Sequence, residues 1–139
     1  MIKIKNLLLV LSMLFATSFY GQTVLYKTTS LSMSVKGERN GKWTPYTDAK
    51  PVAILAKIDL DKNRILIHSD IEQLYQIGTY YPVVEKEDCY INTFKCLSLE
   101  GDTVDVVIIS DKKGNHHEMY LKEFNRVLLY SMQKMTDKK

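Results

Sequence analysis

From Val24 onward, hydrophobic and polar residues alternate with a period of two, in short runs that turn-forming residues separate. This pattern is typical of antiparallel strands that bury one face. It predicts about eight strands, over residues 24–36, 52–60, 64–69, 74–80, 89–99, 103–110, 118–124 and 127–132. The clearest hairpin joins the second and third of these strands across Asp61-Lys62-Asn63. In the first strand, the apolar positions Leu25, Leu31, Met33 and Val35 predict that the odd-numbered residues face the core.

Two stretches depart from simple alternation. Residues 42–51 should be irregular, because Pro45 and Pro51 cannot donate hydrogen bonds to a central ladder. Near the end of the chain, several apolar residues also fit a period of 3.6, so a short C-terminal helix is an alternative to the last strand. These residues are Tyr120, Leu121, Phe124, Val127 and Leu128.

The order of the expected strands favours one architecture. Consecutive strands joined by tight turns usually pair with their neighbours. A meander of this length tends to close on itself or fold into two layers, because open sheet edges invite aggregation. The sequence therefore predicts an all-β fold, an antiparallel meander of about eight strands that forms a barrel or a half-barrel.

The first residues have the layout of an export signal. Lys3 and Lys5 precede an apolar run over residues 7–15, and small residues follow at 16–18. The run is shorter than the roughly 20 apolar residues that cross a bilayer as a helix. We expect residues 1–21 to be a signal peptide and residues 22–139 to be a single β domain. The mature domain is expected in the periplasm or outside the cell, without membrane insertion after cleavage.

The charge of the mature domain changes what its partners can be. Removing residues 1–21 takes away Lys3 and Lys5, so 19 basic residues become 17 against 16 acids, and the formal net charge falls from +3 to +1. A nearly balanced charge without a cluster of basic residues gives little electrostatic drive toward nucleic acid or an anionic membrane. We therefore expect an unknown small ligand or an envelope protein as the partner, and no nucleic acid.

The sequence carries no recognisable catalytic or cofactor motif. It has no G-x-S-x-G nucleophile elbow and no glycine-rich phosphate loop. His116 and His117 are neighbours, and neighbouring residues of a strand point to opposite faces, so they cannot chelate one metal ion together. The expectation is a domain that is not an enzyme and that needs no metal or other cofactor.

Cys89 and Cys96 are the only cysteines. On one extended strand they would lie roughly 20 Å apart, whereas a disulfide needs Cα atoms within about 7 Å. A bridge requires a turn between them, and residues 90–95 are mostly aromatic or β-branched. A disulfide is therefore unlikely, and two small buried side chains are the main expectation.

The aromatic residues suggest where a ligand binds. Large amphipathic rings line small-molecule pockets and interface hot spots, although they are also ordinary strand residues. The candidate ligand-binding residues are Trp43, Tyr46, Tyr75, Tyr80 and Tyr81. The leading hypothesis is an exported, non-enzymatic binding domain for a small or extended ligand. The alternative is an envelope protein interaction module that uses an exposed aromatic patch or a strand edge.

Three short segments carry resemblances. Gly41-Lys42-Trp43 resembles the G-x-W motif of lipocalins, which implies a lipocalin-like barrel with Trp43 packed at its end. Ser18-Phe19-Tyr20-Gly21-Gln22, together with the series of hairpins, resembles short exported β proteins of Bacteroidota. Asp102-Thr103-Val104 is similar to the O-glycosylation motif of that group, which implies a possible glycan on Thr103.

Overall fold

The computed structural model describes residues 23–69 and 71–135. The expected signal segment, residues 1–21, lies outside the described residues. The described part contains ten strands and no helix. The strands are β1 (Thr23–Val35), β2 (Lys50–Pro51), β3 (Leu55–Asp59), β4 (Arg64–His68), β5 (Glu72–Tyr80), β6 (Val84–Glu85), β7 (Cys89–Ser98), β8 (Thr103–Asp111), β9 (His117–Lys122) and β10 (Arg126–Lys134).

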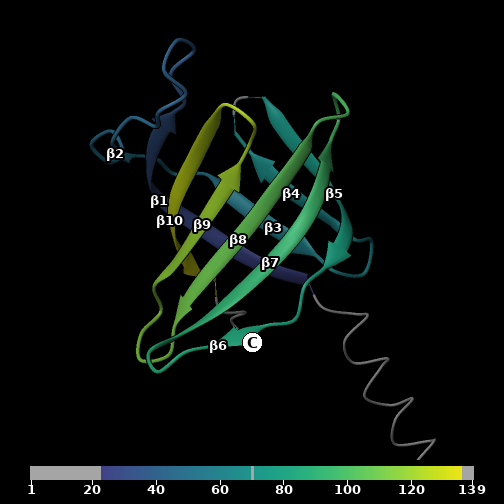
Figure 1. Cartoon of the computed structure of the whole chain (residues 1–139). Helices are drawn as coiled ribbons and strands as arrows, with labels where there is room; N and C mark the ends of the chain where they lie inside the picture. Colours follow the sequence, from purple (N-terminus) through teal and green to yellow (C-terminus); the bar gives the residue numbers. More distant parts are fainter. Residues whose placement is uncertain (1–22, 70, 136–139) are drawn as a thin grey trace, which may run out of the picture.

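Eight of these strands form a closed antiparallel barrel (Figure 1). Their order is β10-β9-β8-β7-β5-β4-β3-β1, and β1 pairs with β10 to close the ring. The short strands β2 and β6 add to β1 and β7 outside this ring. The prediction of an all-β antiparallel meander of about eight strands is confirmed, and the sheet closes as a barrel.

The last strand resolves the helix alternative. Residues 126–134 form β10, which pairs with β9 on one side and β1 on the other. Leu128, Tyr130 and Met132 are buried in it at every second position. The helical interpretation of this segment is wrong, because the two neighbouring strands leave no backbone group free for a helical turn.

The register of β1 differs from the predicted one. An irregularity between Thr28 and Ser30 inserts an extra residue opposite β10. Before it the buried residues are Tyr26 and Thr28, and after it Leu31 and Met33 pack against the core. The expectation of a continuous odd-numbered core face is wrong for the first half of the strand, since a β-bulge transfers the inward position from even to odd residues. It is also wrong at the end of the strand, where Val35 is exposed and Ser34 is buried and donates to the carbonyl oxygen of Thr44.

A second irregularity lies in β5. Ile77 is opposite Cys96 and Thr79 is opposite Lys95, so Gly78 is the extra residue. As a result Tyr80 is opposite the buried Phe94, and the two rings meet edge to face at 5.6 Å.

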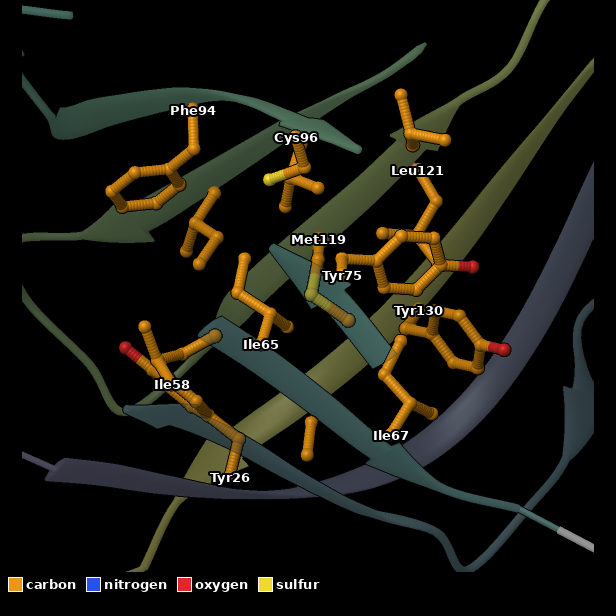
Figure 2. Close-up of a cluster of buried hydrophobic side chains, with 14 of the residues drawn as sticks. Tyr26, Ile58, Ile65, Ile67, Tyr75, Phe94, Cys96, Met119, Leu121 and Tyr130 are labelled. Atoms are coloured by element: carbon orange, nitrogen blue, oxygen red, sulfur yellow. The ribbon is translucent and has the colours of Figure 1, made fainter. Parts of the chain in front are cut away.

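The interior of the barrel is filled with side chains (Figure 2). Ile65, Ile67, Met119, Leu121 and Met132 are completely buried. An eight-stranded barrel is just wide enough to be filled in this way or to hold one small ligand. Because bulky side chains occupy the described interior, a binding site is to be sought at the barrel ends.

The residues between β1 and β3 run back alongside the C-terminal half of β1. The backbone N–H groups of Thr44, Thr47 and Val52 donate to the carbonyl oxygens of Val35, Met33 and Thr29 at 2.8, 2.9 and 3.1 Å. The segment contains only the two-residue strand β2, as the prolines led us to expect. It extends beyond the barrel as the long loop beside β1 in Figure 1.

Truncating a completely buried residue should unfold the barrel far more readily than truncating an exposed one. We expect Ile67→Ala to lower the free energy of unfolding by about 2–5 kcal/mol, because it leaves a cavity in a filled interior. The matched control Leu99→Ala, on an exposed turn, should change it by less than about 0.5 kcal/mol. Urea denaturation followed by circular dichroism measures both values, and equal losses would show that the interior is not the source of stability.

Candidate functional site at the upper mouth of the barrel

Three connections meet at one end of the barrel, the upper end in Figure 1. They join β4 to β5, β7 to β8 and β9 to β10, and they come together because every second connection of a meander returns to the same end. A depression of about 950 Å³ lies between them. It is lined by residues 71–75, 98–100, 102–105 and 122–126. We call this depression the upper mouth.

The rim of the upper mouth carries exposed apolar side chains. Ile71, Leu99 and Phe124 are 82%, 74% and 86% exposed, more than any other large apolar side chain of the described residues. Each belongs to a different connection, and all three line the upper mouth. Single exposed apolar residues are normal on a protein surface, whereas three of them around one depression make it a candidate binding surface.

A tight turn presents Leu99. The N–H of Ser98 donates to the carbonyl oxygen of Asp102 at 2.8 Å, and the N–H of Gly101 donates to the carbonyl oxygen of Ser98 at 3.0 Å. Gly101 has a φ of 89°, a left-handed conformation that costs little only for glycine. The backbone thus fixes the turn, and the Leu99 side chain is left free to project.

Phe124 lies beside a cation. The Lys36 ammonium lies 5.2 Å from the centre of the Phe124 ring. The Lys36 N–H also donates to the carbonyl oxygen of Asn125 at 2.8 Å, which ties the end of β1 to the β9–β10 connection. One side of the rim is therefore both aromatic and basic.

The floor of the upper mouth is polar. The Tyr75 hydroxyl donates to Oε1 of Gln73 at 2.8 Å, and Nε2 of Gln73 donates to the Ser69 hydroxyl at 3.2 Å. The Ser69 hydroxyl donates in turn to the carbonyl oxygen of Ile71 at 2.5 Å. This chain of hydrogen bonds connects the barrel interior with the rim residue Ile71.

Two buried tyrosines have raised pKa values. Desolvation, and then the nearby Glu123 carboxylate, raises the pKa of Tyr75 to about 12. Burial also raises the pKa of Tyr130, which is a core residue, and the hydroxyls of both tyrosines project to the same side of the cluster in Figure 2. Both hydroxyls are protonated at neutral pH, as an unperturbed tyrosine also is, and that of Tyr75 already donates to Gln73.

The sequence-based candidate residues lie in different places. Tyr75 is the one of the five that lines the upper mouth. Tyr46 lies on the outside, where its ring meets that of Tyr120 at 6.5 Å, and Trp43 forms an isolated bridge with Lys36. Tyr80 and Tyr81 are at the other end of β5. No aromatic contact joins Trp43 or Tyr46 to Tyr75, Tyr80 or Tyr81 in the described part.

Sequence reasoning missed the rim residues. Ile71, Leu99 and Phe124 are not among the predicted ligand-binding residues. The alternation places Leu99 and Phe124 only as the last residues of predicted strands, and Phe124 otherwise only in a possible helix. A signal was present, since Leu99 and Phe124 are apolar residues followed directly by the turn formers Glu100-Gly101 and Asn125.

The lower end of the barrel holds a small polar network around His117. Nδ1 of His117 lies 2.8 Å from the Ser110 hydroxyl, and Nε2 lies 3.3 Å from Oδ1 of Asn115. The same Asn115 oxygen accepts the N–H of Lys134, so we infer that Nε2 carries the proton and Nδ1 accepts from Ser110. The Tyr26 ring meets the imidazole edge to face at 5.1 Å.

The described residues offer few candidates for a metal site. Within residues 23–69 and 71–135, no three His, Cys, Asp or Glu side chains are grouped so that they could hold a metal ion. His116 is exposed and approaches Glu118, and it takes no part in the His117 network.

Thr103 is exposed at the start of β8 and lines the upper mouth, where its O-glycosylation stays a prediction.

Over the described residues, no helix has the length and hydrophobicity to span a membrane.

Both cysteines are free thiols on β7. They lie seven residues apart on this strand, with Cys96 buried in the interior and Cys89 partly exposed. Burial, and then the Asp105 carboxylate, raises the pKa of Cys96 to about 12. Cys96 is therefore a packing residue and not a nucleophile at neutral pH.

The His117 environment should make stability depend on pH. Burial, and then Lys134 and His116, lowers the pKa of His117 below 6.5, while Asp111 opposes this. As the pH falls, the unfolded chain binds the proton at a higher pH than the folded protein does. The stability that neutral His117 contributes is therefore complete above about pH 6.5 and is lost as the pH falls through the pKa of the folded state. Thermal unfolding between pH 8 and pH 4.5 should show a smaller drop in Tm for His117→Gln than for the unmodified protein. Identical slopes would contradict this role for His117.

The two thiols should differ in reactivity. At pH 8, Ellman's reagent should label Cys89 and leave Cys96 unmodified until denaturant is added, because only the thiolate reacts and Cys96 is buried. The variant Cys89→Ser should then show almost no labelling in the folded state. Rapid labelling of Cys96, or a loss of two hydrogens by mass from the unlabelled protein, would overturn this assignment.

The chain matches no model of a protein family, no curated protein and no solved structure.

Proposed function

We propose that this chain is a non-enzymatic binding domain that takes a small ligand at the upper mouth of the barrel. The expected export signal would send it to the periplasm or the cell exterior. The observation that supports this function best is the position of Ile71, Leu99 and Phe124. The three most exposed large apolar side chains of the described part surround one depression.

The energetics of the rim favour a ligand with apolar surface. Fully burying one Leu, Ile or Phe side chain is worth about 1.5–3 kcal/mol. Three such residues contribute at most about 9 kcal/mol and association costs at least about 4 kcal/mol, so burial of the rim alone supports submillimolar affinity at best. Tighter binding requires the burial of the ligand's own apolar surface as well. The volume of about 950 Å³ is at the upper end of the range for small-molecule sites.

A protein interaction module remains the second candidate, and one region supports it. Among the described strands β6 pairs only with β7, so its outer edge is free to accept another strand. Tyr81, Val83 and Val84 are exposed beside this edge. Lys112 spans β6 and β7, since its ammonium bonds to Glu85 at 2.9 Å and lies 4.9 Å from the centre of the Tyr90 ring.

A neutral apolar dye tests the upper mouth. N-phenyl-1-naphthylamine should fluoresce more strongly in the presence of the mature protein, and Leu99→Ser or Phe124→Ser should each weaken its binding about tenfold or more, because a loss of 1.4 kcal/mol is a factor of ten. The matched control is Val84→Ser, an exposed apolar residue at the other end of the barrel, which should bind the dye normally.

The same titration separates the competing sites. Loss of dye binding in Val84→Ser, with normal binding in the two rim variants, would move the function to the β6 edge. Loss of binding in Trp43→Phe alone would instead favour the sequence-based aromatic site. No dye binding by the unmodified protein would count against a small-molecule site.

A further inference from the structure

We propose that the upper mouth selects a cationic amphiphile, a small molecule with an ammonium or guanidinium head and an apolar body. This inference rests on the proposed function and adds the chemical class of the ligand. Its basis is the distribution of charge around the rim.

The lining of the upper mouth is acidic. It contains five acids and two bases, Lys122 and Arg126. Five negative and two positive charges give a formal charge of −3. The acids are Glu72, Glu100, Asp102, Asp105 and Glu123. The expected mature chain carries 17 basic residues against 16 acids, so this excess is particular to the site and not a property of the whole surface.

Two of these acids already have basic neighbours. Glu123 forms an ion pair with Arg126 across the β9–β10 connection. Asp105 is the cross-strand partner of Lys95 on β7 and of Lys122 on β9, an arrangement that favours opposite charges. Of these basic neighbours, only Arg126 forms an ion pair, whereas Lys95 and Lys122 are cross-strand neighbours of Asp105. In the described part, Glu72, Glu100 and Asp102 have no basic residue of the lining as a neighbour in the sheet or in an ion pair.

The three remaining acids are weakly compensated. Glu72 has Nδ1 of His68 at 3.6 Å, and an imidazole provides a full positive charge only when it is protonated. Asp102 takes part in its turn through backbone atoms, with its N–H donating to the Ser98 hydroxyl at 3.1 Å. The carboxylates of Glu100 and Asp102 belong to no ion pair among the described residues.

Acid and apolar positions alternate along the rim. Glu72 directly follows Ile71, and Glu100 directly follows Leu99. Tyr75 pairs with Ser98 in an antiparallel arrangement, so the chain before Tyr75 and the chain after Ser98 lie at the same end of the barrel. A ligand head between these two connections would meet carboxylates, while its apolar part would contact the adjacent side chains.

The opposite side of the rim fixes the orientation of the ligand. The Lys36 ammonium lies 5.2 Å from the centre of the Phe124 ring, whereas the charge of Arg126 is already paired with Glu123. Lys36 would repel a second positive charge near Phe124. The head therefore belongs near Glu100 and Asp102, and the apolar body extends toward Phe124. An anionic membrane surface fits this rim poorly, because carboxylates stand beside its apolar side chains.

Three probes of equal chain length test the preference. Decyltrimethylammonium, decanoate and neutral decanol are titrated below their micelle concentrations by calorimetry at low salt, pH 7.5. We expect the cation to bind about tenfold more tightly than the anion, and this difference should shrink as salt is added. Leu99→Ser should weaken binding of all three probes.

Neutralising the acids tests the cause. The double variant Glu100→Gln with Asp102→Asn should abolish the cation preference, so that the cation binds no more tightly than decanol, and the turn should keep its shape because backbone hydrogen bonds hold it. The matched control is Glu87→Gln with Asp88→Asn, two acids near the β6–β7 connection at the other end. This control should retain the preference.

Each other outcome has a distinct meaning. Equal affinity for cation and anion, with both lost in Leu99→Ser, would overturn the charge preference and retain the upper mouth as a site. Binding to phosphatidylglycerol vesicles that requires Leu99, without binding of any monomeric probe, would make the rim a membrane contact and overturn the inference. Failure to bind any probe or vesicle would overturn both the inference and the proposed function.

Discussion

The pairing of β1 with β10 is the interaction on which the rest of the structure depends. It joins the two ends of the described chain, and it removes the two long edges that an open eight-stranded meander would expose. Both strands are long, so the junction extends from Tyr26 and Lys134 to Val35 and Arg126. Closure therefore also brings Lys36, directly after β1, to Phe124 and Asn125 at the upper mouth.

Closure around a filled interior decides where function can lie. Completely buried side chains such as Ile65, Ile67 and Met119 occupy the space that a larger barrel would offer to a ligand. The polar groups of Gln73 and Tyr75 instead reach the upper mouth, and those of Ser110 and His117 lie at the lower end. With the proposed function, the middle of the barrel would supply stability and its ends would supply recognition.

The strands could be predicted from the sequence because their apolar residues alternate, as Ile65 and Ile67 do in β4. Closure and register could not, because they depend on irregularities at Thr28–Ser30 and at Gly78 that leave no clear local signature. The site was missed for a related reason. Alternation identifies residues that face the core, whereas Ile71, Leu99 and Phe124 matter because they do not face it. Tyr75 was selected because it is aromatic, and it lines the upper mouth although its side chain is buried.

The turn that carries Leu99 has a consequence for how this surface can change over time. Its shape is set by Ser98, Gly101 and backbone hydrogen bonds, and neither the Leu99 nor the Glu100 side chain takes part in them. Substitutions at these two positions can alter recognition while the barrel remains intact. Descendants of this chain could acquire new ligands by drift at a few turn positions, and libraries randomised there would retain folded members.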